Sequence, residues 1–321
     1  MSENIKILAI VGATASGKSA LAEALALRLG GEIVSADSMQ IYRGMDIGTA
    51  KPTLEERGRV PYHLIDIADA TADFSVADYI VAADAAIADI AARGKLPILC
   101  GGTGLYLDAL LRGLPESPAA DPSLRAELAA RAEREGAQAL HRALAAVDPQ
   151  SAAVTPPGNL RRVIRALEIY ISSGITKTEW DKKSLENPPR YAANVIGMTY
   201  RDRELLYRRI EQRVDLMLAA GLVEETARLE EAGVFRLSRT AAGAIGYKEI
   251  LPYLRGESDL SSAVQTLKTA TRRYAKRQIT WFSAKDYVRP LYADDGEGNL
   301  RNFEEIVNNA LAMCKGTNDM L

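Results

Sequence analysis

Hydrophobic positions in the first hundred residues form three short runs, over residues 5–11, 32–36 and 96–100. Glycine or a polar residue bounds each run, as is typical of short buried strands. Between the first two runs, Leu21, Leu25 and Leu29 fall on one stripe and predict a helix over 18–29, which Gly30 and Gly31 end.

A second helix is expected after Ser75, because Ser75 and Asp78 have the spacing of a capping box. Apolar residues recur on one face of this segment as far as Ile90, and Gly94 ends it. The resulting order is strand, helix, strand, helix, strand. That order predicts an α/β fold with a parallel, doubly wound sheet.

The pattern changes at about Pro115, where prolines cluster and strand signals stop. The chain up to about Pro189 shows charged, alanine-rich helical patterns, which predict an inserted helical domain. A further strand over 193–200 then returns to the sheet. Long helices should follow over 202–220 and 261–281, and the sequence allows an edge strand over 287–292 in spite of Pro290. The predicted domains are the first part of the core over 1–117, the helical insertion over 118–190, and the second part of the core with basic C-terminal helices over 191–321.

Charge is balanced overall, with 40 basic and 42 acidic residues, but it is distributed unevenly. Residues 1–118 hold ten basic and fifteen acidic residues, a net charge of −5. Residues 236–289 hold eleven basic and four acidic residues, a net charge of +7. Such asymmetry indicates a face that binds a polyanion, although solvated helix surfaces can produce the same pattern.

Two cysteines, Cys100 and Cys314, lie far apart and form no zinc motif or disulfide framework. The apolar run near the N-terminus is too short to span a membrane, and no signal peptide is visible. We therefore expect a soluble, cytoplasmic protein.

Residues 12–19 fit the phosphate-binding pattern G-x-x-x-x-G-K-[ST] at every position, between a predicted strand and a predicted helix. Glycines let the backbone fold around an anion, and the N–H groups and the helix N-terminus attract it. Lys18 adds a full positive charge, and the Ser19 hydroxyl can hold Mg²⁺. The motif predicts a bound diphosphate or triphosphate, and it is found in nucleotide- and ATP-binding proteins. It does not by itself indicate hydrolysis.

ATPases of this type usually carry an acidic residue at the end of another strand, where it orders Mg²⁺ and water. The third strand here ends in Cys100-Gly101-Gly102-Thr103 and offers no acid. Asp37 instead follows the second strand, where it should face the same crevice. From the residues alone, its carboxylate could act as a general base, anchor a kinase substrate, or hold a Mg²⁺-bound water.

Several further motifs resemble those of the tRNA dimethylallyltransferase family along nearly the whole chain. The most specific are the block from Asp37 to Pro52 and the string from Lys276 to Trp281. Within the phosphate-binding loop, Ala13 and Ser19 replace a frequent Pro and Thr and keep the chemistry. The other matching segments are residues 101–106, 121–125, 162–168, 209–213 and 245–247.

The resemblance implies that a prenyl group moves from dimethylallyl diphosphate to the exocyclic N6 amine of the adenosine 3′ of the anticodon. It implies catalytic roles for Asp37 as general base, Thr103 as hydrogen-bond donor and Arg213 as diphosphate ligand. Mg²⁺ on Ser19 would be the cofactor. The implied diphosphate-binding residues are Gly12, Ala13, Thr14, Ala15, Ser16, Gly17, Lys18 and Ser19.

The implied partner is the anticodon stem-loop of tRNA, whose target base must leave its stack. No membrane partner is expected, and the enzyme should be a monomer. On the C-terminal helix, Lys268, Arg272 and Lys276 share one stripe that suits phosphate contacts. The residues assigned to tRNA are Asp37, Ser38, Met39, Gln40, Thr103, Arg125, Arg161, Arg162, Arg165, Gly246, Tyr247, Lys276, Arg277 and Gln278.

Two other functions compete with this interpretation. A small-molecule or nucleoside kinase would leave the basic C-terminal helix unexplained. A non-catalytic tRNA-binding protein with a nucleotide switch would leave Asp37 without a task. Trp281 and Phe282 could stack on bases, although core roles are favoured. His63 and His141 are interpreted as structural.

Overall fold

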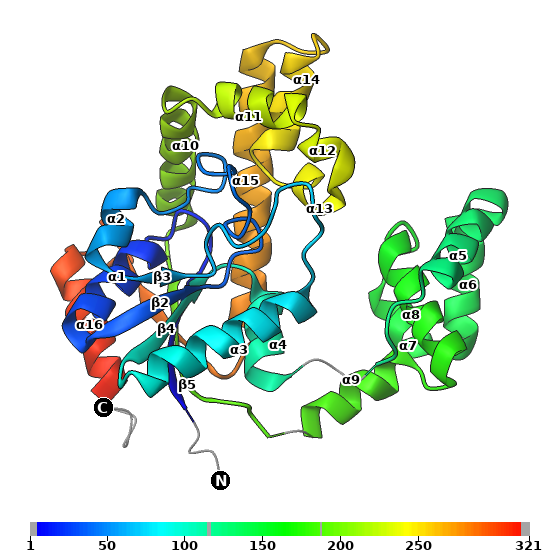
Figure 1. The fold of residues 1–321 in the computed structure, drawn as a ribbon, viewed down its shortest axis with the longest axis horizontal. Coiled ribbons are helices and arrows are strands. Elements are labelled where there is room, and N and C mark those ends of the chain that lie inside the picture. The colour runs from blue at the N-terminus through cyan, green and yellow to red at the C-terminus, as the bar shows by residue number, and fades with distance from the viewer. Residues whose placement is uncertain (1–4, 114–116, 187, 316–321) are drawn as a thin grey trace. The chain divides into compact units, whose positions relative to one another are not determined.

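The computed structural model describes residues 5–113, 117–186 and 188–315, and its centre is a six-stranded parallel sheet (Figure 1). The strand order is β3-β2-β4-β1-β5-β6, so β1 lies between β4 and β5. The predicted parallel α/β sheet is confirmed. The strands are β1 (Lys6–Gly12), β2 (Gly31–Ser35), β3 (Tyr62–His63), β4 (Leu96–Gly101), β5 (Ala192–Thr199) and β6 (Val288–Tyr292).

Helices cover both faces of this sheet because side chains along each buried strand alternate between the two sides. In β1, Leu8 and Ile10 pack in one apolar cluster with helices α1, α10 and α16, whereas Ile7 and Ala9 pack in another with α3 and α4. The doubly wound arrangement follows from this alternation. The helices that cover the sheet are α1 (Lys18–Leu29), α3 (Val76–Ala92), α4 (Gly104–Arg112), α10 (Arg203–Ala219) and α16 (Phe303–Lys315).

A third apolar cluster lies beyond the carboxyl ends of the strands and joins the segment 39–47 to several C-terminal helices. Tyr42, Met45 and Tyr247 are fully buried in it. The long helix α15 packs beside α10 and α14, as the upper part of Figure 1 shows. The helices of this region are α11 (Leu222–Glu231), α12 (Val234–Leu237), α13 (Arg239–Ala242), α14 (Tyr247–Leu254) and α15 (Leu260–Ser283), whereas the short helix α2 (Leu54–Arg59) lies beside α1 in Figure 1.

The chain divides into two compact units, one made of residues 1–111 and 191–321 and the other of residues 112–190. The second unit has its own apolar core, which includes Leu140, Leu144 and Val163. Its described residues contain helices and no strand. They form α5 (Pro122–Glu135), α6 (Ala137–Val147), α7 (Pro149–Val154), α8 (Leu160–Ser173) and α9 (Lys177–Glu186).

The long elements match their sequence patterns closely, and the Ser75–Asp78 capping box is present. The two-residue strand β3 and the four-residue helices α12 and α13 were not predicted, because elements this short leave no periodic signal. None of the described helices combines the length and apolar composition needed to cross a bilayer.

Candidate active site

The phosphate-binding loop connects the end of β1 to the start of α1. A Cβ at Gly12 would lie 2.5 Å from the carbonyl oxygen of Met198 in β5, so only glycine fits there. Ala15 and Gly17 have positive φ angles of 60° and 95°, which turn the backbone into a cradle of N–H groups. Inside it, the buried Ser16 hydroxyl has no hydrogen-bond partner among the described residues. A buried orphan donor in a backbone cradle fits an anionic ligand.

Three neighbouring elements fix the shape of this loop from outside. The Oε1 of Gln278 in α15 accepts the N–H of Thr14 at 2.8 Å. Arg209 in α10 donates from Nε to the Ala15 carbonyl at 3.0 Å. The hydroxyl of Tyr200 donates to the Ser16 carbonyl at 3.1 Å. The cradle is therefore preorganised by side chains that come from distant parts of the sequence.

Cationic groups gather at the loop without an equal number of carboxylates. Burial lowers the pKa of the Lys18 ammonium, and the Arg213 guanidinium lowers it further. Burial likewise lowers the pKa of Arg213, helped by Arg209, while Asp37 opposes both shifts. Mutually repelling cations in a desolvated place are costly unless an anion binds there. The arrangement therefore favours a polyanionic ligand such as a diphosphate.

The end of β4, which lies next to β1, has a thiol where ATPases of this type place an acid. Burial raises the pKa of the Cys100 thiol to about 11, against the opposing effects of Lys18 and a hydrogen bond with Ser19. The Cys100 thiol also donates to the Lys18 carbonyl at 3.8 Å. The described residues hold no group of three metal-ligating side chains. The chain itself therefore offers the Ser19 hydroxyl, but no carboxylate at this strand end.

Asp37 and Thr103 follow β2 and β4, whose ends touch. A Cβ at Gly101 would lie 2.1 Å from the Ala36 carbonyl oxygen, which shows how closely the two segments of the backbone pass each other. The Thr103 hydroxyl oxygen accepts the Ser38 N–H at 3.2 Å. The Asp37 Oδ1 accepts the N–H groups of Met39 at 2.9 Å and Gln40 at 3.4 Å. Asp37 thus caps its own turn through one oxygen, and its second oxygen accepts no hydrogen bond within the described parts of the chain.

Helix α15 contacts each residue of the turn that carries Thr103. A Cβ at Gly102 would lie 2.2 Å from the Gln278 amide, whose Nε2 donates to the Gly102 carbonyl at 2.9 Å. A Cβ at Gly104 would lie 2.3 Å from the ring of Trp281, which is 37% exposed. Tyr274 reaches Thr103: burial raises the pKa of its phenol to about 12, and hydrogen bonding to Thr103 opposes the rise.

Several residues that the sequence assigned to tRNA also make hydrogen bonds within the protein. The Tyr247 side chain is buried, and its hydroxyl donates to Glu225 at 2.7 Å. Gly246 donates its N–H to Glu249 at 2.9 Å. Gln278 is buried and holds the two loops described above. These contacts hold the backbone of Gly246 and the side chains of Tyr247 and Gln278 in place, and direct contact of the three residues with tRNA stays a prediction.

On α15, the predicted basic stripe is only partly free. Lys268 pairs with Asp215 at 2.7 Å, and Arg272 pairs with Glu211, both acids of α10. The acids of α10 therefore compensate the charge of these two cations, and their contact with phosphate stays a prediction. Lys276 and Arg277 are exposed, and the Arg277 guanidinium lies 5.5 Å from the centre of the Tyr274 ring.

In the helical unit, Arg125 and Arg165 both pair with the buried Glu168, at 3.0 Å and 2.7 Å. Arg161 and Arg162 are exposed at the start of α8.

Both histidines make structural contacts, as expected: His63 pairs with Glu32, and His141 contacts the carbonyl oxygens of Ala152 and Thr155. Phe282 is a core residue, whereas Trp281 is partly exposed.

Sequence reasoning missed Arg209, Tyr200 and Tyr274 as site residues. Arg209 lies in a segment that resembles the family, so the sequence did contain a signal for it. The sequence did not show which way its side chain points from α10. Tyr200 and Tyr274 carry no motif of their own. Their places depend on how β5 and α15 pass the phosphate-binding loop, which only the fold decides.

The sheet order, the backbone cradle after β1 and the adjoining carboxylate define an α/β protein with a P-loop-like fold. The IPP transferase family matches residues 40–285, and the isopentenyl transferase family matches residues 5–65. The chain therefore belongs to the IPP transferase family.

Individual relatives agree with this assignment. A tRNA dimethylallyltransferase of Geobacter metallireducens is 51% identical over 280 residues, which cover 87% of this chain and 90% of the relative. The tRNA isopentenylpyrophosphate transferase of Bacillus halodurans is a similar solved structure, with a TM-score of 0.71, 43% identity, and coverage of 98% and 96% of the two chains. A eukaryotic dimethylallyltransferase acting on tRNA has a TM-score of 0.77 at 29% identity, covering 96% of this chain and 80% of that one.

Proposed function

We propose that this chain transfers a dimethylallyl group from dimethylallyl diphosphate to the N6 amine of the adenosine 3′ of the anticodon in tRNA. Its family makes it a prenyltransferase that modifies tRNA. The observation that supports the finer assignment is a cradle with two buried cations, Lys18 and Arg213, and a single carboxylate, Asp37, at the same sheet edge. We also propose that the protein acts as a monomer in the cytoplasm.

The cradle would hold the diphosphate of the donor. The Ser16 hydroxyl and backbone N–H groups of the loop would bind phosphate oxygens, except the N–H groups of Thr14 and Ser16, which already have partners in the protein. Lys18 and Arg213 would neutralise the phosphate charge. Negative charge on the diphosphate grows as its bond to the allylic carbon breaks. Cations that are already in place then stabilise the departing group more than the intact donor, and this difference accelerates the reaction.

Mg²⁺ fits this site as a partner of the donor rather than of the protein alone. Ser19 is the chain's ligand for it, and phosphate oxygens and water would complete the six oxygens that Mg²⁺ prefers. When bound, the ion would supply further charge stabilisation for the leaving diphosphate. Changing Ser19 to Ala should therefore raise the Mg²⁺ concentration that donor binding requires.

Asp37 would act on the acceptor. The adenine amine is a poor nucleophile because its lone pair is delocalised into the ring. As the new bond forms between N6 and the allylic carbon, the carbon–oxygen bond to diphosphate breaks and one amine proton must leave. The free oxygen of Asp37 can take this proton while its other oxygen stays bound to the turn. Thr103, beside Ser38, is placed to hydrogen-bond substrate at the same edge.

The acceptor tRNA would approach along exposed basic side chains. Lys276 and Arg277 lie on α15 within one to two turns of Tyr274 and Trp281, and Arg161 and Arg162 begin α8. Phosphate contacts of this type supply affinity and orientation, while the site itself selects the base. Ser38, Met39 and Gln40 follow Asp37 and would line the acceptor side. The Gln40 side chain is bonded to Ser35, Thr49 and Ala50, so it would act by shaping the turn.

One assay separates this function from a kinase and from a binding protein. The purified chain is incubated with unmodified tRNA, Mg²⁺ and either radiolabelled dimethylallyl diphosphate or γ-labelled ATP. We expect label from the prenyl donor to enter tRNA without ATP consumption. Transfer of the ATP phosphate to any acceptor, or ATP hydrolysis stoichiometric with tRNA modification, would overturn the proposal. The Lys18→Met variant, which lacks the cradle cation, is the control and should transfer little prenyl label.

A further inference from the structure

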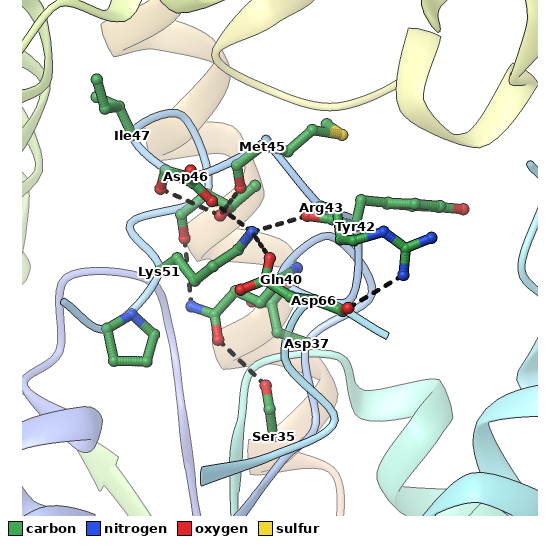
Figure 2. A network of polar contacts seen from close by, with 12 residues as sticks. Ser35, Asp37, Gln40, Tyr42, Arg43, Met45, Asp46, Ile47, Lys51 and Asp66 are labelled. Carbon is green, nitrogen blue, oxygen red and sulfur yellow. Dashed lines mark hydrogen bonds and ion pairs between the residues drawn. The ribbon is translucent and has the colours of Figure 1, made fainter. Parts of the chain in front are cut away.

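The ammonium group of Lys51 is buried behind the acceptor side of the site, with its side chain only 1% exposed. It donates to the Tyr42 carbonyl at 2.7 Å and to carboxylate oxygens of Asp46 and Asp66, each at 2.6 Å. Figure 2 shows these three contacts converging on one nitrogen. An ammonium has three N–H donors, so all of them are used. Lys51 is therefore a fully satisfied internal cross-link and has no donor left for substrate.

This cross-link closes the loop formed by residues 42–51 onto the neighbouring segment at Asp66. Arg57 binds the other oxygen of Asp66 at 2.7 Å, so two cations and two carboxylates balance each other. Burial would raise the pKa of Asp66, but the hydrogen bonds from Lys51 and Arg57 together outweigh it and leave that pKa below its usual value. Asp66 also has a positive φ of 59°, a conformation that its surroundings must enforce.

The closed loop leads directly to the residue proposed as the base. The Gln40 amide donates to the carbonyl oxygens of Thr49 and Ala50, at 3.3 Å and 3.2 Å, just before Lys51. Its Oε1 accepts from the Ser35 hydroxyl at 3.1 Å, and its backbone N–H donates to Asp37. Figure 2 shows Gln40 lying between the loop and Asp37. Moving residues 49–51 would therefore move Gln40, whose backbone N–H is, with that of Met39, one of the two donors that orient the Asp37 carboxylate.

A second support holds the same loop independently of Lys51. The buried carboxylate of Glu225 accepts the N–H groups of Ile47 and Gly48, both at 3.0 Å, and the Tyr247 hydroxyl. The ring of Tyr247 packs on Gly48, where a Cβ would lie 2.4 Å away. Ile47 and Gly48 directly precede Thr49 and Ala50, so the middle of the loop should stay anchored if the Lys51 cross-link is lost. Loss of Lys51 should then loosen mainly the last residues of the loop, at Ala50 and Lys51, where Gln40 binds.

We propose that Lys51 is a positioning residue for the prenyl transfer, holding the 42–51 loop so that Gln40 keeps the Asp37 carboxylate aimed at the acceptor amine. This inference rests on the proposed function, because it assigns Asp37 the role of base. Lys51 touches neither donor nor acceptor; it acts through Thr49, Ala50 and Gln40. Its effect should appear in the chemical step, since a displacement of about 1 Å can cost about 100-fold in rate.

The test measures single-turnover prenyl transfer, with saturating donor and tRNA, for Lys51→Met, Asp37→Asn and the double variant. We expect Lys51→Met to be slower by about 10- to 100-fold, with its Kd for dimethylallyl diphosphate within about twofold of wild type. The double variant should be no slower than Asp37→Asn alone, because Lys51 has nothing left to position once the base is gone. Lys95→Met, which makes the same change at an exposed site, is the matched control.

A wild-type rate for Lys51→Met would overturn the proposal, as would a further loss of rate in the double variant or a parallel loss of donor affinity. If Lys51→Met does not fold, Asp66→Asn decides instead: it removes one charge from the cross-link and should lower the rate in the same non-additive way. Absence of label transfer by the wild-type chain would refute the proposed function itself, so the two failures are distinguishable.

Discussion

The two oxygens of Asp37 have different tasks, and this permits a clean substitution. In Asp37→Asn, the amide oxygen can still accept the N–H groups of Met39 and Gln40, so the turn and the fold should persist. The amide cannot take a proton. We expect the single-turnover rate of prenyl transfer to fall by about 10²- to 10⁴-fold, while tRNA binding is retained. A near wild-type rate would reduce Asp37 to a turn cap.

The buried positive charge of Arg213 should lower the stability of the free protein, although it favours binding of the donor. Burial disfavours its charge, with a smaller contribution from Arg209, and together they outweigh the favourable effect of Asp37, so the pKa of Arg213 is lowered in the free enzyme. Arg213→Met should therefore raise the melting temperature of the free protein while weakening the binding of dimethylallyl diphosphate. Thermal unfolding without the donor gives the melting temperature of the free protein, and the rise in melting temperature on adding the donor reports its binding. A lower melting temperature in the free variant would contradict this account of the cationic cradle.

At the scale of elements, Glu32 ties three of them together. From β2 it pairs with Arg93 at the end of α3 and with His63 in β3. The hydrogen bonds from Arg93 lower the pKa of Glu32 from 4.5 to about 2, against the effect of burial. For a carboxyl whose pKa is lowered by folding, the stabilisation is complete above the unfolded pKa and is lost as the pH falls through the folded pKa.

Glu32→Gln should therefore cost about 1–2 kcal/mol in the free energy of unfolding at pH 7, a figure that allows for the partly exposed Arg93. The difference between variant and wild type should shrink as the pH falls from about 4.5 to about 2. Denaturant unfolding of both proteins at several pH values in this range measures the difference in the free energy of unfolding. A difference that does not change with pH would mean that packing, and not the charge of Glu32, links these elements.

At the scale of the whole molecule, tRNA binding should depend on the exposed cations and not on the paired ones. Replacing Lys276 and Arg277 together by Ala should weaken tRNA binding and reduce the slope of log K against log salt by about 1 to 2. The matched control replaces both partners of the Lys268–Asp215 ion pair by neutral residues, which leaves the net charge unchanged. Its slope should equal that of wild type. Equal slopes for both variants would show that α15 is only a solvated surface.

The sequence predicts helices and strands well, but it does not predict which side chains contact each other across the fold. The Ser75 capping box, the α1 stripe and the central strands were predictable because their causes are local. Lys268 and Arg272 looked free because their partners, Asp215 and Glu211, lie far earlier in the sequence on α10, and nothing local reveals that pairing. Gln278 stood in a recognisable motif, yet its buried position between Thr14 and Gly102 became visible only in the fold.

The sequence by itself determined the parallel α/β core, the phosphate-binding loop and the placement of Asp37 at a strand end. These follow from short-range spacing, since strand alternation, glycine placement and helix caps act within a few residues. Only the tertiary structure decided what surrounds them: Arg209 and Tyr200 on the loop carbonyls, and Lys51 inside its cage of oxygens. Burial and charge compensation arise between segments that are distant in sequence, so they exist only once the chain has packed.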